Sequence, residues 1–160
     1  MGKLSPFFTA CMLFVAACAS GSTTVLEPAQ SDFRAETITV RQAEDTVEVD
    51  QAVSEEYGVK LAEYLYEEGV FSEGGDITVE YRFIQMEEGS RALRYVVGLG
   101  AGKASMTIES VFLDQEGNEL AKIQSGGEIS GGLFGGGLNE AVAKAAKETA
   151  DFAIDRFASL

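Results

Sequence analysis

The segment Ile77-Thr78-Val79-Glu80-Tyr81-Arg82-Phe83 decides the fold class, because apolar and polar side chains alternate along its whole length. Successive side chains of a β-strand point to opposite faces of a sheet, so this alternation predicts a half-buried strand. The apolar face of such a strand must be covered by other elements of the chain.

Two amphipathic segments are expected to provide that cover. The first has apolar residues at helical spacing between an N-cap, either Asp50 or Ser54, and Gly69 just past its end. The second begins at Asn139 as N-cap and runs to about Ala158, with an apolar stripe rich in alanine. The small side chains of this stripe allow close packing of the helix on a sheet.

Three further segments are expected to be strands. Thr37–Arg41 alternates with a period of two, Ala104–Phe112 places its apolar residues on one face, and Leu120–Ser125 follows a turn at Asp114–Gly117. Residues 91–97 fit a short helix or a strand equally well. The order strand, helix, strand, hairpin, helix predicts the α+β class: a single two-layer domain with a mixed sheet of about four strands and two helices on one face.

The N-terminus has the features of an export signal. Lys3 is followed by an apolar run from Phe7 to Ala17, which at 1.5 Å per residue is too short to cross a hydrocarbon core of about 30 Å. The residues Val15-Ala16-Ala17-Cys18 resemble a bacterial lipobox. The resemblance implies cleavage before Cys18 and a diacylglycerol on its thiol. The alternative is an ordinary signal peptide that ends near a cysteine.

These features divide the chain into a signal peptide (1–17), a lipidated cysteine with a flexible tether (18–32) and the α+β domain (33–160). The tether is predicted from its content of Ser, Thr, Ala and Gln and from Pro28. Ala19, rather than an aspartate, follows the cysteine, which implies a periplasm-facing protein held by lipid at the outer membrane of a Gram-negative envelope.

The net charge of the chain limits the classes of partner that it can bind. The sequence has 12 bases, 26 acids and no histidine, and Lys3 is the only charged residue of the signal, so the mature chain carries a net charge of −15. Such a surface is repelled by nucleic acid and by anionic headgroups, which excludes a nucleic-acid partner and leaves the acyl chains as the link to the membrane. Simple solubility also accounts for the acidity. With Cys11 removed and Cys18 acylated, no disulfide is expected.

No catalytic, metal or cofactor site is expected. Gly98–Lys103 lacks the glycine spacing of a nucleotide-binding loop and leads into a strand, so no nucleotide is expected to bind. Asp114, Glu116 and Asn118 resemble the start of a calcium loop but lack its later ligands, which favours a plain turn. The absence of histidine removes most metal sites and most acid–base catalysis, so the protein is expected not to be an enzyme.

Two groups of residues are candidates for contact with a partner. Arg91, Arg94 and Lys103 either bind an anionic partner or neutralise nearby acids. Leu133 and Phe134 stand in the glycine-rich segment 126–137 and either complete the protein's own core or dock into a partner or a second subunit.

Several of these residues also support a family resemblance. The runs Glu88–Arg94 and Val97–Ala104, the turn at Asp114–Gly117 and the later glycines resemble the bacterial lipoproteins of the domain-of-unknown-function family numbered forty-four ten, over roughly residues 33–159. This family has no established activity, so the resemblance implies a location and a fold rather than a reaction. The order of elements is more distantly similar to curli-secretion and Tol-type envelope domains.

The sequence therefore favours an outer-membrane lipoprotein of unknown molecular function that serves as a non-catalytic periplasmic interaction or envelope-assembly module. Its expected partners are the membrane, through the acyl anchor, and a protein partner or further copies of itself. Two alternatives remain: a carboxylate-dependent hydrolase of an envelope polymer and a subunit of an export ring.

Overall fold

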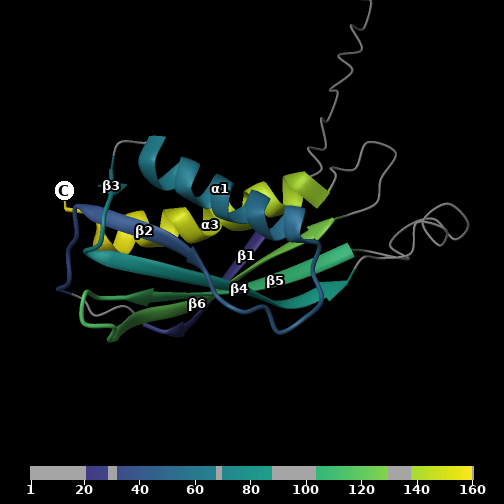
Figure 1. Cartoon of the computed structure of the whole chain (residues 1–160), viewed down its shortest axis with the longest axis horizontal. Helices are drawn as coiled ribbons and strands as arrows, with labels where there is room; N and C mark the ends of the chain where they lie inside the picture. Colours follow the sequence, from purple (N-terminus) through teal and green to yellow (C-terminus); the bar gives the residue numbers. More distant parts are fainter. Residues whose placement is uncertain (1–20, 29–31, 68–69, 88–103, 130–137, 160) are drawn as a thin grey trace, which may run out of the picture.

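The computed structural model describes residues 21–28, 32–67, 70–87, 104–129 and 138–159 (Figure 1). In chain order, the elements are β1 (Gly21–Glu27), β2 (Thr37–Gln42), α1 (Gln51–Glu67), β3 (Ser72–Glu73), β4 (Ile77–Glu87), β5 (Ala104–Leu113), β6 (Glu119–Ile129) and α3 (Leu138–Phe157).

The strands form one mixed sheet in the order β1-β6-β5-β4-β2-β3. The pairs β1–β6, β6–β5 and β5–β4 are antiparallel, whereas β2 lies parallel to both β4 and β3. The α+β class and the mixed sheet are confirmed, but the sheet has six strands rather than about four. The two strands missing from the sequence prediction, β1 and β3, are the edges of the sheet.

Strand β1 also corrects the predicted tether at residues 18–32. Gly21–Glu27 pairs along its length with β6, from Gly21 opposite Gly127 to Val25 opposite Ile123. An edge strand needs only one row of backbone partners and leaves most of its side chains in water. The Ser- and Thr-rich composition that favoured a linker therefore also suits this strand.

Both helices lie side by side on one face of the sheet, as predicted (Figure 1). Asp50 is the N-cap of α1, because its Oδ1 accepts a hydrogen bond from the backbone N–H of Ala52 at 2.9 Å. The alternating apolar residues Ile77, Val79, Tyr81 and Phe83 of β4 are all buried in the core, as their alternation predicts. The largest fully buried side chains of this layer include Tyr57, Leu61, Leu65, Val79, Phe83, Ile108, Phe112, Ile123, Val142 and Phe157.

A chain of hydroxyl groups crosses this core between the two helices and the sheet. Tyr57 Oη lies 2.8 Å from Thr149 Oγ1, which in turn lies 3.0 Å from Ser125 Oγ. Nearby, Tyr81 donates a hydrogen bond to the backbone carbonyl of Ser54 at 3.0 Å. A methyl group at Gly58 would lie 2.5 Å from Tyr81 Oη, which explains a glycine in the middle of α1 despite its low helix propensity.

These two tyrosines predict a loss of stability at alkaline pH. Burial raises the pKa of Tyr81 to about 12, and burial also raises the pKa of Tyr57 above its ordinary value of 10. Above about pH 10 the unfolded chain loses these protons first, so the unfolded state binds fewer protons than the folded state. The free energy of unfolding should then fall by about 1.4 kcal/mol per pH unit for each tyrosine.

Urea unfolding between about pH 8 and pH 11.5 tests this expectation. The Tyr81→Phe variant should show a shallower decline above about pH 10 than the wild type, because it has one ionisable group fewer. Equal slopes for the two proteins would contradict the assignment.

Candidate functional site

One end of the sheet brings together the residues that flank the predicted contact segments. Gly21 of β1 pairs with Gly127 of β6, Gly127 with Met106 of β5, and Met106 with Met86 of β4. These four residues form one row across four strands, and the end of the sheet marked by this row is called the Gly21 end. Helix α3 starts there too, because Ala141 in its first turn packs directly on Gly127.

All three segments that carry sequence-predicted site residues attach at the Gly21 end. Cys18 precedes Gly21 by three residues, the segment 88–103 joins Glu87 to Ala104, and the segment 130–137 joins Ile129 to Leu138. The structure thus gathers the ends of segments that are far apart in sequence. The candidate residues themselves, Cys18, Arg91, Arg94, Lys103, Leu133 and Phe134, lie outside the described residues, as does the helix-or-strand question for 91–97. Their contacts stay predictions.

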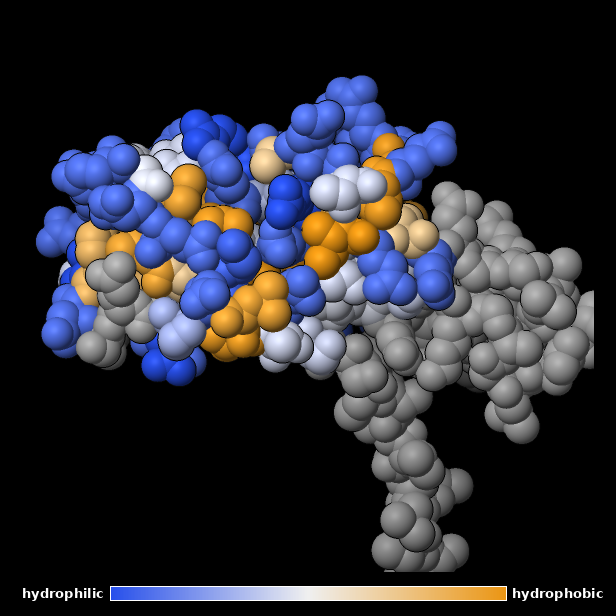
Figure 2. Space-filling model, turned by 90° about the horizontal axis from the view of Figure 1, so that it is seen from below, coloured by the Kyte–Doolittle hydropathy of each residue, from blue (hydrophilic) through white to orange (hydrophobic). Residues whose placement is uncertain are grey.

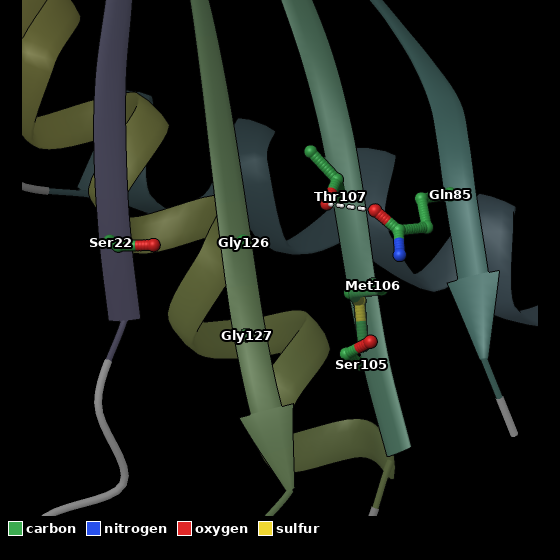
Figure 3. A pocket seen from close by; sticks show the side chains of 7 residues that line it. All are labelled: Ser22, Gln85, Ser105, Met106, Thr107, Gly126 and Gly127. Atoms are coloured by element: carbon green, nitrogen blue, oxygen red, sulfur yellow. Dashed lines mark hydrogen bonds between the residues drawn. The ribbon is translucent and has the colours of Figure 1, made fainter. Parts of the chain in front are cut away.

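A shallow cavity of about 490 Å³ opens on the outer face of the sheet next to this end (Figure 3). Four strands contribute its lining, which consists of Ser22, Gln85, Ser105, Met106, Thr107, Gly126 and Gly127. The side chains of Thr107 and Gln85 point toward one another and are joined by a hydrogen bond of 3.4 Å. The lining contains hydroxyl and amide groups but no carboxylate or base. Such a cavity can bind a polar group, but it supplies no acid or base for catalysis.

Backbone forms part of the cavity because two glycines lie side by side in β6. A Cβ atom at Gly127 would lie 3.1 Å from the carbonyl oxygen and 3.2 Å from the Cβ atom of Ala141, so glycine lets α3 approach the sheet closely. A Cβ atom at Gly126 would lie 3.1 Å from the carbonyl oxygen of Met106. These glycines belong to the regular strand β6, whereas the sequence interpretation placed them in a presenting loop at 126–137.

The rest of the outer face holds cross-strand ion pairs. Arg82 of β4 donates from Nη2 to Glu109 Oε1 of β5 at 2.5 Å and from Nε to the same oxygen at 3.0 Å. Arg41 of β2 pairs with Glu80 of β4. Figure 2, which views the molecule from the side opposite the helices, shows mainly hydrophilic side chains on this face with separate hydrophobic patches among them. Glu109 is only 8% exposed, and its charge is neutralised by Arg82.

The predicted turn at Asp114–Gly117 is present at the opposite end of the sheet and uses its own carboxylate. Asp114 Oδ1 accepts hydrogen bonds from the backbone N–H groups of Glu116 and Asn118, and Oδ2 accepts one from the Asn118 side chain. The Asn118 side chain and these backbone N–H groups lower the pKa of Asp114.

Among the described residues, no group of three or more His, Cys, Asp or Glu is arranged to hold a metal ion.

Sequence reasoning missed the cavity residues for a geometric reason. Ser105 and Thr107 alternate with inward residues of β5, so the pattern places them on the outer face. Their proximity to Ser22 depends on the strand order and on β1, which the composition did not reveal.

Neither described helix has the length and apolar character needed to cross a bilayer.

Solved structures include proteins that share this fold. Two crystal structures of the PelC dodecamer from Paraburkholderia phytofirmans, one of them of a point variant, are similar to this chain with TM-scores of 0.60 and 0.58. The sequence identity is 10% in both, and the aligned region covers 88% and 86% of this chain and 100% and 98% of the PelC chain. At this identity the likeness shows a shared fold and no more. A search of curated proteins found no match.

The sequence model of one family matches residues 31–131, which is more than half of the chain. The matched range starts after β1 and stops before α3, so it is shorter than the 33–159 expected from the sequence. It includes β2, α1 and the strands β3 to β6. This chain therefore belongs to the family described as Domain of unknown function (DUF4410).

Proposed function

We propose that this protein is a lipid-anchored, non-catalytic envelope protein that assembles with further copies of itself through the free edge of β1. The observation that carries the proposal is the edge itself. Within the described residues, β1 pairs on one side only, with β6, and its seven residues form the longer of the two sheet edges. The opposite edge consists of the two residues of β3 and of the part of β2 that β3 does not cover, Thr39–Gln42.

The side chains of β1 suit contact with another chain. Natural edge strands are usually protected by lysine, proline, a bulge or a covering element. In β1 the bulge at Leu26 and the following Pro28 lie at the far end, which leaves Gly21–Val25 regular. Val25 and Leu26 are 46% and 42% exposed, and they are two of the three large hydrophobic residues of the described chain that are exposed. Backbone pairing and apolar contact are therefore both available there.

The fold supports self-assembly by analogy. The PelC structures that share this fold are dodecamers, and this chain spans the whole PelC subunit. The chemistry of the described surface also favours binding over hydrolysis, because the cavity lining contains no carboxylate and the buried Glu109 is neutralised by Arg82. The lipid anchor is supported by the lipobox resemblance at Val15–Cys18.

The anchor is tested by changing Cys18 to serine. Cells given labelled palmitate should label the wild type and leave Cys18→Ser unlabelled and uncleaved. A Cys18→Ser protein that is still processed to a form starting at residue 18 would show that an ordinary signal peptidase acts there and would refute the lipobox interpretation.

The interface is tested by placing a charge on the edge. Val25→Lys should shift the protein from an oligomer toward the monomer, because a lysine on an edge strand opposes pairing with another chain. Sedimentation velocity of the acylated protein in detergent measures the change. Val59→Lys is the matched control, since Val59 is 65% exposed on α1 away from the edge and should leave the oligomer intact. The edge assignment fails if both variants behave alike.

A further inference from the structure

We infer that the Gly21 end of the sheet faces the lipid surface and is held against it by the short distance between Cys18 and β1. The inference rests on the proposed lipid anchor and adds to it an orientation and a contact surface. It uses the register of β1 and the number of residues that separate this strand from Cys18.

The spacing limits how far the folded body can stand from the membrane. Gly21 follows Cys18 by three positions in the sequence, and a fully extended chain spans at most about 3.6 Å per residue. Gly21 therefore lies within about 11 Å of the acylated residue in any conformation of the intervening chain. A flexible tether of the length predicted from sequence would have imposed no such limit.

The register then places a whole row of residues near the same surface. Gly21 lies in one row with Gly127, Met106 and Met86, and neighbouring strands are about 4.8 Å apart, so this row is only about 15 Å wide. Leu113, at the other end of β5, lies seven residues from Met106 and thus about 23 Å farther along the strand.

Both this end and the faces of the sheet carry charged groups, so the short spacing from Cys18, and not surface polarity, selects the Gly21 end. The row itself contains no charged residue, but the next row toward the lipid contains Glu87 and Glu128 on either side of Ser105. Contact through the outer face of the sheet would bring Arg41, Glu80 and the Arg82–Glu109 pair against the headgroups. Contact through the β1 edge would bury the strand that the proposed assembly requires.

Charge does not set this orientation. Glu87 and Glu140 are exposed near the Gly21 end, so anionic headgroups would repel rather than attract it. The orientation follows from the covalent link and its length, and it should hold on vesicles of neutral phosphatidylcholine.

This orientation restricts how copies can assemble. Copies whose Gly21 ends all face one membrane are related by an axis perpendicular to that membrane. Antiparallel pairing of two β1 strands would turn one Gly21 end away from the lipid and is therefore excluded. A closed cyclic arrangement satisfies the constraint for any number of copies.

The test uses single fluorophores on the acylated protein in phosphatidylcholine vesicles that contain a lipid with a nitroxide on its headgroup. The mature chain has no cysteine besides Cys18, so Glu87→Cys and Glu116→Cys each provide one free thiol. Both positions are exposed glutamates, one at the Gly21 end and one in the opposite turn. The label at position 87 should be quenched several-fold more strongly than the label at position 116. Insertion of about ten Gly and Ser residues between Ser20 and Gly21 extends the reach by up to about 35 Å and should remove most of this quenching.

Three results would overturn the inference: equal quenching at the two positions, stronger quenching at position 116, or quenching at position 87 that is unchanged by the insertion. Failure of the proposed function would look different. An unacylated protein would not bind the vesicles at all. A monomeric protein whose label is quenched mainly at position 87 would refute self-assembly but still support the proposed orientation.

Discussion

Replacing Phe157 with alanine is expected to lower the free energy of unfolding by about 3–5 kcal/mol, the usual cost of removing a fully buried phenylalanine. Phe157 is 0% exposed at the end of α3. Its ring lies 5.4 Å from that of Phe112 on β5 and 6.3 Å, edge to face, from that of Phe33, which precedes β2. The side chain thus joins the last helix to the middle of the sheet and to the chain that enters β2.

Chemical denaturation of Phe157→Ala measures this loss, with Phe152→Ala as control. Phe152 lies on the same helix, 5.5 Å from Phe112, but is only partly buried, so its removal should cost clearly less. Equal losses for the two variants would contradict the assignment of Phe157 as the residue that closes the core at this end.

Replacing Arg82 with alanine is expected to cost about 2–3 kcal/mol, because Glu109 would then keep its charge in a nearly buried position without a partner. Arg82 contacts Glu109 through two nitrogen atoms, and the Glu109 side chain is 11% exposed. The second change Glu109→Gln should recover most of the loss, since a neutral amide carries a far smaller desolvation cost than a carboxylate.

Arg41→Ala is the matched control for this prediction. Arg41 pairs with Glu80 on the same face, but the two side chains are 60% and 27% exposed, so water screens the pair. Its loss should cost less than about 1 kcal/mol. An Arg82→Ala variant that is as stable as Arg41→Ala, or a double variant that is no more stable than Arg82→Ala, would refute the role given to the buried pair.

The sequence predicts the core layer of this fold well because the core depends on side-chain periodicity. The alternation of Ile77–Phe83 and the apolar stripes of α1 and α3 record directly which faces are buried. Strand β1 cannot be predicted from periodicity, because it is held by hydrogen bonds to the backbone of β6. Residues of almost any type can form such bonds. Strand β3 has two residues and offers no period to detect.

The site is less predictable than the core, and the register of the sheet explains why. Cys18, Lys103 and Leu133 stand out in the sequence by chemistry alone. That their segments attach at one end follows only from pairs such as Gly21 with Gly127 and Ala104 with Ile129. No local pattern encodes such pairs, because they depend on how strands distant in sequence align.

Native mass spectrometry of the acylated protein, extracted in mild detergent, tests the central claim of self-assembly most directly. The account predicts one closed species with a fixed number of copies, which Val25→Lys converts largely to monomer. A wild-type protein that shows only the mass of a single acylated chain would contradict it.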